Sequence, residues 1–468
     1  MYKPLLCWRY LKTRYLALVC VVSVMLGVAT LIVVNGVMAG FSTKLRDRLH
    51  GVLADVAIES FAFDGFENPD AMMARIRSSA AGPYVAAMCP AIETPGMIQF
   101  TFRGVPVTKM VRVVGVDAAA RAAVGGFGEY LYDDKDEHIA PSYELSPMAK
   151  YRFDSFRMPS LPAPMTANPP EAGEAPPVDE WVHEEKRIAG MLAGRALVHV
   201  PRHDKNGVSH QDFYTCELGD TVSLVCLGGA KLTPEYDRFA LAGYFKSEMS
   251  EYDSGMVFVP LDHLQRLRGM QDRATSIQLK LTDYSKANFV IEALKQEFSP
   301  FDFAVQTWEE KQGPILAAID IERGILNVLL FLIVGVAGFG ILAIFSMIVV
   351  EKTRDIGVLK ALGASNAGIM GIFLGYGLLL GVVGDLLGTG TGLAISHNLN
   401  SIESFLSSVT GQQVFNRQVY NFNNIPVDVQ PMNVLWINLG AIAVAAVFSL
   451  LPAMKAARLL PVRALRFE

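Results

Sequence analysis

The chain has 468 residues, of which 51% are hydrophobic and only 19% are charged, and its mean hydropathy is positive at +0.30. This balance excludes an ordinary soluble multidomain protein and indicates that part of the chain lies in lipid. The formal net charge of −5 shows no basic excess, which argues against a nucleic-acid partner.

Four apolar windows are each long enough to cross the roughly 30 Å hydrocarbon core of a bilayer as a helix. We therefore predict an α-helical membrane protein with four transmembrane helices. The first window is longer than the apolar region of a cleaved signal peptide, which favours a membrane anchor. The helices are predicted at residues 15–41, 325–350, 367–395 and 432–453.

Basic residues are unevenly distributed over the segments that flank these windows. Lys and Arg are frequent in 1–14, 351–366 and 454–468, whereas the 396–431 loop contains only one of them, Arg417. The positive-inside rule places basic segments in the cytoplasm. Both termini and the 351–366 loop are therefore predicted to be cytoplasmic, and the rest of the chain between the helices to be outside.

The large external segment alternates strand-like and helix-like runs, which predicts an extracytoplasmic α+β domain in two parts, 42–122 and 191–324. Between them, 123–190 is predicted to be a Pro-rich insertion, because residues 159–179 contain seven prolines and few large apolar side chains. In the first part the strand-like runs are 54–60, 97–104 and 109–117, and the helix-like run is 67–79. In the second part the runs mix strands and helices, at 194–201, 214–229, 239–245, 256–269 and 276–283.

Three cysteines fall in the external segment, and two interpretations fit them. Cys216 and Cys226 are spaced to bridge a hairpin in an oxidising compartment. We favour the alternative, in which Cys89, Cys216 and Cys226 are small buried side chains.

The external histidines do not have the spacing of a metal site. His203 begins the HDKNG stretch, which is typical of a hairpin turn, and His199 and His210 lie on either side of it, so we predict no metal site. The chain also lacks a GxxxxGK[ST] motif, so nucleotide binding is expected on another chain.

Glycines recur on one face of the third predicted helix, spaced by 4, 3, 4 and 4 residues. Small residues at this spacing allow helix backbones to approach closely in lipid, so this helix is predicted to have a close helical neighbour. Asp385 lies beside this face, and we predict a structural hydrogen-bonding role for it rather than proton relay. The five glycines are Gly377, Gly381, Gly384, Gly388 and Gly392.

The cytoplasmic stretch VVEKTRDIGVLKALGAS, residues 349–365, combines charges in its first turns with an apolar arc later on. Gly363 is positioned to end the helix. A helix that lies on a membrane surface is rich in Lys and Arg, whereas the signs here are nearly balanced, so docking into a partner's groove is predicted. The candidate docking residues are Glu351, Lys352, Arg354, Asp355, Ile356, Leu359 and Leu362.

Two stretches, EKTRDIGVLKALGAS (351–365) and LPAMKAARLLPVRALRFE (451–468), resemble the FtsX-like permease domain of ABC transporters. GYFKSEMSEYDSGMVFVPLDHLQRL (243–267) is similar to the transmembrane subunits of lipoprotein-releasing systems, the LolC/LolE type. The resemblance implies a MacB-like periplasmic core domain and a non-catalytic permease subunit in the bacterial cytoplasmic (inner) membrane. It also implies a second permease subunit, in a homo- or heterodimer, and a separate ATPase dimer that binds ATP and Mg²⁺.

The resemblance further implies that the protein extracts lipoproteins from the outer leaflet for transfer to a periplasmic carrier, with residues 351–365 as the helix that couples to the ATPase. The resemblance also implies that the cavity for the acyl chains lies between the first and second spans of the two subunits, here around residues 24–35 and 327–339. We expect those spans to be free to line such a groove, since the third span uses its glycine face for helix packing. The expected groove residues are Val24, Val28, Leu31 and Phe331.

Two other functions stay open on the sequence. A mechanotransmission permease for efflux or envelope remodelling would share the membrane domain. A membrane-anchored hydrolase or sensor would need a nucleophile–base or metal constellation, and the sequence offers none that we recognise.

Overall fold

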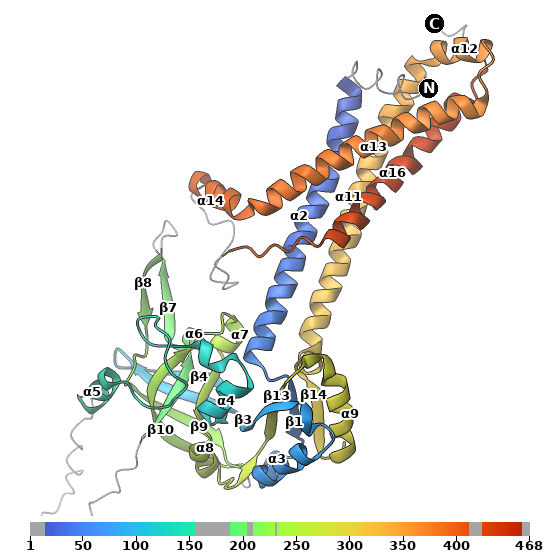
Figure 1. The fold of residues 1–468 in the computed structure, drawn as a ribbon. Helices are drawn as coiled ribbons and strands as arrows, with labels where there is room; N and C mark the ends of the chain where they lie inside the picture. Colours follow the sequence, from blue (N-terminus) through green and yellow to red (C-terminus); the bar gives the residue numbers. More distant parts are fainter. Residues whose placement is uncertain (1–14, 156–187, 204–208, 230–231, 411–423, 461–468) are drawn as a thin grey trace, which may run out of the picture. The chain divides into compact units, whose positions relative to one another are not determined.

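The structure is a computed structural model that describes residues 15–155, 188–203, 209–229, 232–410 and 424–460. The chain divides into two compact units, shown as a ribbon in Figure 1. The membrane unit comprises the described parts of residues 1–45, 314–415 and 422–468. The sheet unit comprises the described parts of residues 46–313.

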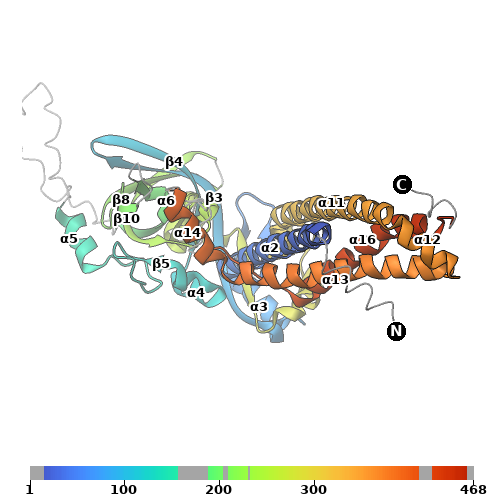
Figure 2. The ribbon, with the colours of Figure 1, turned by 90° about the horizontal axis from the view of Figure 1, so that it is seen from above.

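Within the described residues, four helices are long and apolar enough to cross a membrane. Helices α2 and α11 have 38 and 39 residues, about 57 Å at 1.5 Å per residue, roughly twice the thickness of a hydrocarbon core. The predicted ranges cover only their apolar parts, because the backbone stays helical where the side chains become polar. Figures 1 and 2 show the four helices side by side. They are α2 (Tyr15–Val52), α11 (Gly313–Glu351), α13 (Asn366–His397) and α16 (Pro431–Ala457).

Two shorter helices, α12 (Thr353–Ala361) and α14 (Leu399–Thr410), belong to the membrane unit. Helix α12 stops where Gly363 adopts a φ of +94°, and the Ala364 N–H donates to the Leu359 carbonyl at 3.0 Å. Helix α13 then starts at once, because the Ser365 hydroxyl accepts a hydrogen bond from the Gly368 N–H at 3.1 Å.

The sheet unit is built on a ten-stranded mixed sheet in the order β14-β1-β13-β3-β4-β11-β6-β10-β5, with β9 paired to both β10 and β3. Its longest element is the β3–β4 hairpin, whose two turn residues, Arg103 and Gly104, both have positive φ. The strands are β1 (Val56–Ser60), β3 (Val85–Phe102), β4 (Val105–Val116), β5 (Leu131–Tyr132), β6 (Ala189–Gly194), β9 (Thr221–Leu227), β10 (Pro234–Phe245), β11 (Met256–Pro260), β13 (Ser276–Leu281) and β14 (Phe303–Thr307).

Two small antiparallel pairs lie beside this sheet, β2 (Phe66–Glu67) with β12 (Arg273–Ala274) and β7 (His199–His203) with β8 (Ser209–Tyr214). The β7–β8 pair flanks the predicted HDKNG turn (203–207), and residues 204–208 lie outside the described residues.

Helices pack on the sheet around two apolar cores. One core joins α3 and α9 to β1 and β13 through side chains such as Ile76, Leu294 and Ile58. The other lies among β4, β6, β9, β10, β11 and α8. The helices of this unit are α3 (Pro69–Ser78), α4 (Ala118–Val124), α5 (Pro147–Ser155), α6 (Arg195–Val198), α7 (Ser250–Asp253), α8 (Leu261–Arg268), α9 (Ala287–Glu297) and α10 (Trp308–Lys311).

The predicted insertion at 123–190 is not uniform. Its first part contains the 3₁₀ helix η2 (Gly126–Tyr130), β5 and α5, and β5 pairs with β10 in the main sheet. The apolar anchors Phe127 and Leu131 are buried, which explains why this stretch folds despite its weak pattern. The proline-rich residues 159–179 lie outside the described residues.

The described cysteines are free thiols, and Cys89, Cys216 and Cys226 are all buried. Burial raises the pKa of the Cys89 and Cys226 thiols to about 11, so both stay protonated and unreactive near neutral pH. The buried-side-chain interpretation is confirmed, and the Cys216–Cys226 bridge is absent from the structure.

Candidate functional site

A groove of about 270 Å³ lies in the membrane unit among α2, α11 and α16. One end is polar and is formed by Asn35, Arg323, Asn327 and Asn433. The remaining lining is mainly apolar and consists of Leu31, Phe331, Val334, Trp436, Ile437, Gly440 and Ala441. We call this the amide-headed groove.

The polarity of the amide-headed groove follows from helical spacing. On α11, Arg323, Asn327 and Phe331 recur every four residues and therefore stack on one face of the helix. Asn433 and Ile437 repeat the same step on α16. The polar groups thus fall at the same end of the groove, and the apolar side chains follow one to two turns deeper.

Gly440 faces open space in the groove wall, because a Cβ atom built on it would meet no other atom within 4 Å. Trp436 and Phe331 keep 66% and 62% of their surface exposed, so large aromatic faces are available to a ligand. The groove therefore offers hydrogen-bonding groups and one positive charge at one end and apolar surface at the other.

The segment before α16 packs against α2 next to the polar end. A Cβ atom on Gly40 would lie 2.6 Å from the Pro426 carbonyl carbon, so only glycine permits this approach. The Asp428 N–H donates to the Gly36 carbonyl at 2.9 Å. These contacts fix residues 425–430 beside Asn35.

The glycine face of α13 packs on two helices. Cβ atoms on Gly377 and Gly381 would lie 2.4 and 2.5 Å from Ser449 and Ala445 of α16. The three later glycines instead face α2. A Cβ atom on Gly384 would lie 2.8 Å from Val24, and one on Gly388 would lie 2.8 Å from both Met25 and Val28. A Cβ atom on Gly392 would lie 3.1 Å from Ala29 and Ile32. The periodicity predicts the face correctly, but its contacts change from α16 to α2 along the helix.

This packing corrects half of the predicted groove. Val24 and Val28 are 6% and 1% exposed, because the glycines of α13 lie directly against them. They are therefore core residues and cannot contact a ligand. Leu31 and Phe331, the other two predicted residues, both line the amide-headed groove. The premise that α13 leaves α2 free is wrong, since α2 is its partner.

The polar residues of the groove were not singled out from the sequence. Asn35 and Asn327 lie only at the ends of the two ranges, 24–35 and 327–339, that the family resemblance assigns to the acyl-chain cavity. The signal that would have found the set is the four-residue step from Phe331 back to Asn327 and Arg323, repeated from Ile437 to Asn433.

Helix α12 carries the second set of candidate residues, and the structure divides its apolar arc. Ile356 is 1% exposed and belongs to a core with Ile369 and Ala453. Leu359 packs partly against the same core, whereas Leu362 is 81% exposed. Ile356 is thus corrected from a docking residue to the anchor that holds α12 on its own helices.

The charged residues in and just before α12 are also divided between those held by contacts within the chain and those exposed at the surface. Lys352 Nζ pairs with Asp355 at 2.6 Å, and Arg354 and Glu351 are exposed. Lys360 Nζ donates to the carbonyls of Ala457 and Leu459 at 2.5 and 2.6 Å, which ties α12 to the end of α16. The surface left for a partner is formed by Arg354, Val358 and Leu362.

Asp385 is 3% exposed in α13 and faces α16. In the orientation of the Asn438 amide that gives both its oxygen and its nitrogen a partner, the nitrogen donates a hydrogen bond to Asp385 Oδ1 at 3.3 Å. Thr389 lies within 3.0 Å of the same amide. These contacts give Asp385 a hydrogen-bonding role between the two helices.

In the described parts of the chain, no group of three or more His, Cys, Asp or Glu side chains is placed to hold a metal ion.

The chain is similar in sequence to known permease proteins. Residues 327–461 match the FtsX-like permease C-terminal family. The chain is 31% identical over 257 residues to the lipoprotein-releasing system transmembrane protein LolC of Xylella fastidiosa, covering 54% of this chain and 62% of that protein. It is 31% identical over 217 residues to the corresponding LolE of Haemophilus influenzae, covering 46% and 52%.

These matches confirm the resemblance to LolC/LolE-type permeases. The chain matches only about half to three fifths of the length of these relatives. Among solved structures, the periplasmic region of MacB from Actinobacillus actinomycetemcomitans aligns with 58% of this chain and 97% of its own, at 12% identity and a TM-score of 0.29. A TM-score of this size does not establish a common fold.

Proposed function

We propose that this LolC/LolE-type permease chain is a transmembrane subunit of an ABC transporter that extracts lipoproteins from the outer leaflet of the bacterial cytoplasmic membrane. The cargo passes to a periplasmic carrier, and a separate ATPase supplies the energy. In this proposal the sheet unit is a MacB-like α+β periplasmic domain, and the two termini and residues 351–366 are cytoplasmic.

The amide-headed groove is the observation that supports this proposal most strongly. A lipid-modified N-terminus carries ester, amide and thioether groups at the point where its acyl chains begin. Asn35, Asn327 and Asn433 offer donors and acceptors for those groups, and Phe331 and Trp436 offer apolar surface to the first methylenes.

The size of the groove limits what one chain can hold. Its volume of about 270 Å³ is just below the range of about 300–1,000 Å³ of small-molecule pockets, so it accommodates a linker and the start of a chain rather than several acyl chains. Each methylene left in water costs about 0.8 kcal/mol. The remaining chain length must therefore be covered by a second permease subunit, and we propose that the exposed apolar face of α11 meets it.

Helix α12 is proposed as the coupling helix. Its exposed residues Arg354, Val358 and Leu362 suit a shallow partner groove, and the buried Ile356 and bound Lys360 make it move together with its own helix bundle.

The proposal is tested by filling the groove. Gly440→Phe places a ring in open space at the groove wall, so the fold should persist while transfer of an acylated lipoprotein to a soluble carrier is lost. Gly375→Phe on α13 is the matched control, because it also points into open space but does not line the groove. The assay uses proteoliposomes that contain this chain, its partner subunits and acylated lipoprotein. Equal transfer by both variants would refute a role for the groove.

A mechanotransmission permease remains the second candidate. It is favoured by the unbroken length of α2 and α11, whose 38 and 39 residues continue well past the apolar windows. In that case the Gly440→Phe variant would retain full activity with its natural cargo.

A further inference from the structure

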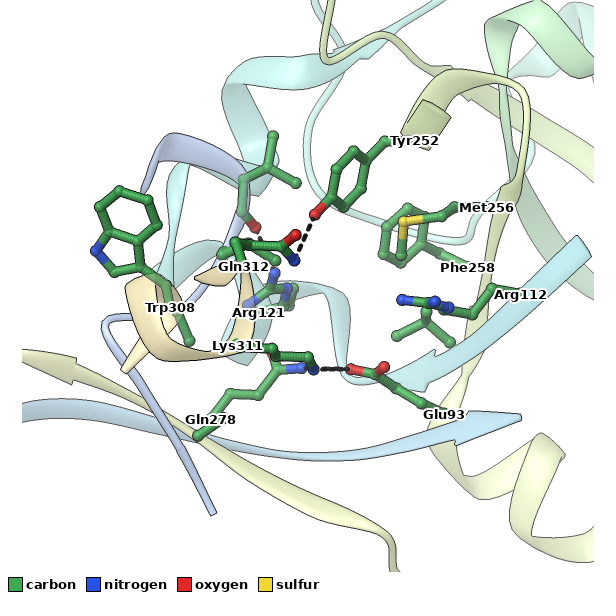
Figure 3. Close-up of a pocket in the computed structure, with 15 residues that line it drawn as sticks. Glu93, Arg112, Arg121, Tyr252, Met256, Phe258, Gln278, Trp308, Lys311 and Gln312 are labelled. Atoms are coloured by element: carbon green, nitrogen blue, oxygen red, sulfur yellow. Dashed lines mark hydrogen bonds and ion pairs between the residues drawn. The ribbon is translucent and has the colours of Figure 1, made fainter. Parts of the chain in front are cut away.

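A small internal cavity lies in the sheet unit, beside the last residue of α2 and the residues that precede α11 (Figure 3). Its volume is about 40 Å³. Charged side chains from four elements line it: Glu93 of β3, Arg112 of β4, Arg121 of α4 and Lys311 of α10.

Arg121 is the central group of this cavity, as Figure 3 shows, and it is only 5% exposed. Its Nη2 donates to the carbonyl of Val52, the C-terminal residue of α2, at 2.5 Å. Its Nε and Nη1 atoms are buried and have no hydrogen-bond partner among the described residues. A guanidinium has five N–H donors and keeps its charge in proteins, so two of its nitrogens require an acceptor.

The carboxylate that lines the cavity does not meet this need. Glu93 accepts a hydrogen bond from Gln278 Nε2 at 3.3 Å and lies 3.8 Å from Lys311 Nζ. Lys311 also contacts Glu59. With Arg112 and Arg121 added, the cations of this cluster exceed its carboxylates by one.

We propose that the cavity binds one small monovalent inorganic anion of about the size of chloride, held by the Nε–H and Nη1–H groups of Arg121. A cavity needs about 10–15 Å³ by the same measure to hold one water, so a volume of about 40 Å³ has room for a small ion with a water and is far below the size of an organic-ligand pocket. Buried charges are paired in proteins, and the excess cation supplies the charge that the anion neutralises.

Desolvation supports the same conclusion, because burial lowers the pKa of Arg121 and a bound anion would oppose that effect. The buried Gln278 Oε1 atom also lacks a donor, and a water beside the anion would supply one.

The position of this site gives it a mechanical consequence. Arg121 holds Val52, and Gln312, which precedes α11, donates to the Tyr252 hydroxyl at 3.1 Å in the same cavity wall. A bound anion therefore stiffens the part of the sheet unit from which both long helices extend. This inference does not depend on the proposed function.

The test uses the full chain in detergent with Trp308 as its sole tryptophan, after Trp8→Phe, Trp181→Phe and Trp436→Phe. Trp308 is 5% exposed and lines the cavity, so bromide in bulk solution reaches it poorly while bound bromide quenches it. Bromide replaces gluconate at constant ionic strength. We expect saturable quenching that chloride reverses, and a saturable rise of about 2–4 °C in the unfolding midpoint.

Arg121→Gln should abolish both effects, and Arg77→Gln, which changes an exposed arginine of α3 outside the cavity, should leave both unchanged. Should Arg121→Gln fail to fold, reversal by chloride in the unsubstituted site decides the question alone. Quenching that rises linearly with bromide and is not reversed by chloride would mean that the cavity holds water only, and would overturn the proposal.

Discussion

The packing of α13 on α2 predicts a specific loss when one glycine gains a methyl group. In Gly388→Ala, the new Cβ would lie 2.8 Å from the Met25 carbonyl oxygen and from Val28 Cβ. Ordinary carbon contacts are about 3.5–4.0 Å, so the two helices must separate by roughly 0.7 Å or more. Overpacking of this kind costs about 1–3 kcal/mol, and the separation also loosens the contacts of Gly384 and Gly392.

The matched control is Gly390→Ala, two residues further on, where a Cβ would meet nothing within 4 Å. It should be neutral or slightly stabilising, because alanine has the higher helix propensity. The assay is equilibrium unfolding of the purified chain in mixed micelles, followed by helical circular dichroism. Equal stabilities of the two variants would refute the proposed α2–α13 contact.

Three further predictions concern other parts of the chain. Leu362→Asp should leave the chain folded but uncouple ATP hydrolysis from transport, whereas Ile356→Asp should destabilise the chain itself by several kcal/mol, because it buries an unpaired charge. Assays of ATPase-coupled transfer and of thermal unfolding distinguish the two effects, and full coupling in Leu362→Asp would contradict the docking role. Burial raises the pKa of Asp253 to about 6 despite hydrogen bonds from Ser247, so between about pH 4 and pH 6 the folded state retains a proton that the unfolded state releases. The free energy of unfolding should therefore fall by about 2–3 kcal/mol as the pH rises from about 4 to 6, and urea titrations of Asp253→Asn should show no such fall. Single cysteines at Ser365 and Gln412, in a chain without its native cysteines, should differ in labelling by an impermeant thiol reagent on intact cells; Gln412 should label, and labelling of Ser365 would reverse the topology.

The sequence predicted the number and apolar extent of the membrane helices because lipid imposes a continuous apolar run. It could not predict where α2 and α11 end, since polar helical turns look the same in any soluble helix. Pairings such as β3 with β13 join residues far apart in the chain, and local patterns carry no information on them.

Local sequence patterns also predicted only part of each candidate site. Periodicity identified the glycine face of α13 but could not say that Val24 and Val28 lie under it, because a helical face does not name its partner. The apolar arc on α12 predicted a docking surface, but Ile356 is buried against other helices of the same chain. Arg121 stands alone in an alanine-rich stretch and shows its role only when Val52 and Glu93 are brought beside it.

The central claim is that acylated cargo contacts the amide-headed groove. Photo-crosslinking amino acids at Trp436 and at Val447 test it most directly, because both positions are on α16, with 66% and 64% of their surface exposed, and only Trp436 lines the groove. In proteoliposomes with the partner subunits, the probe at Trp436 should capture acylated lipoprotein and release it on ATP addition, and the probe at Val447 should capture little. Equal capture at the two positions, or capture of unacylated protein at Trp436, would contradict the account.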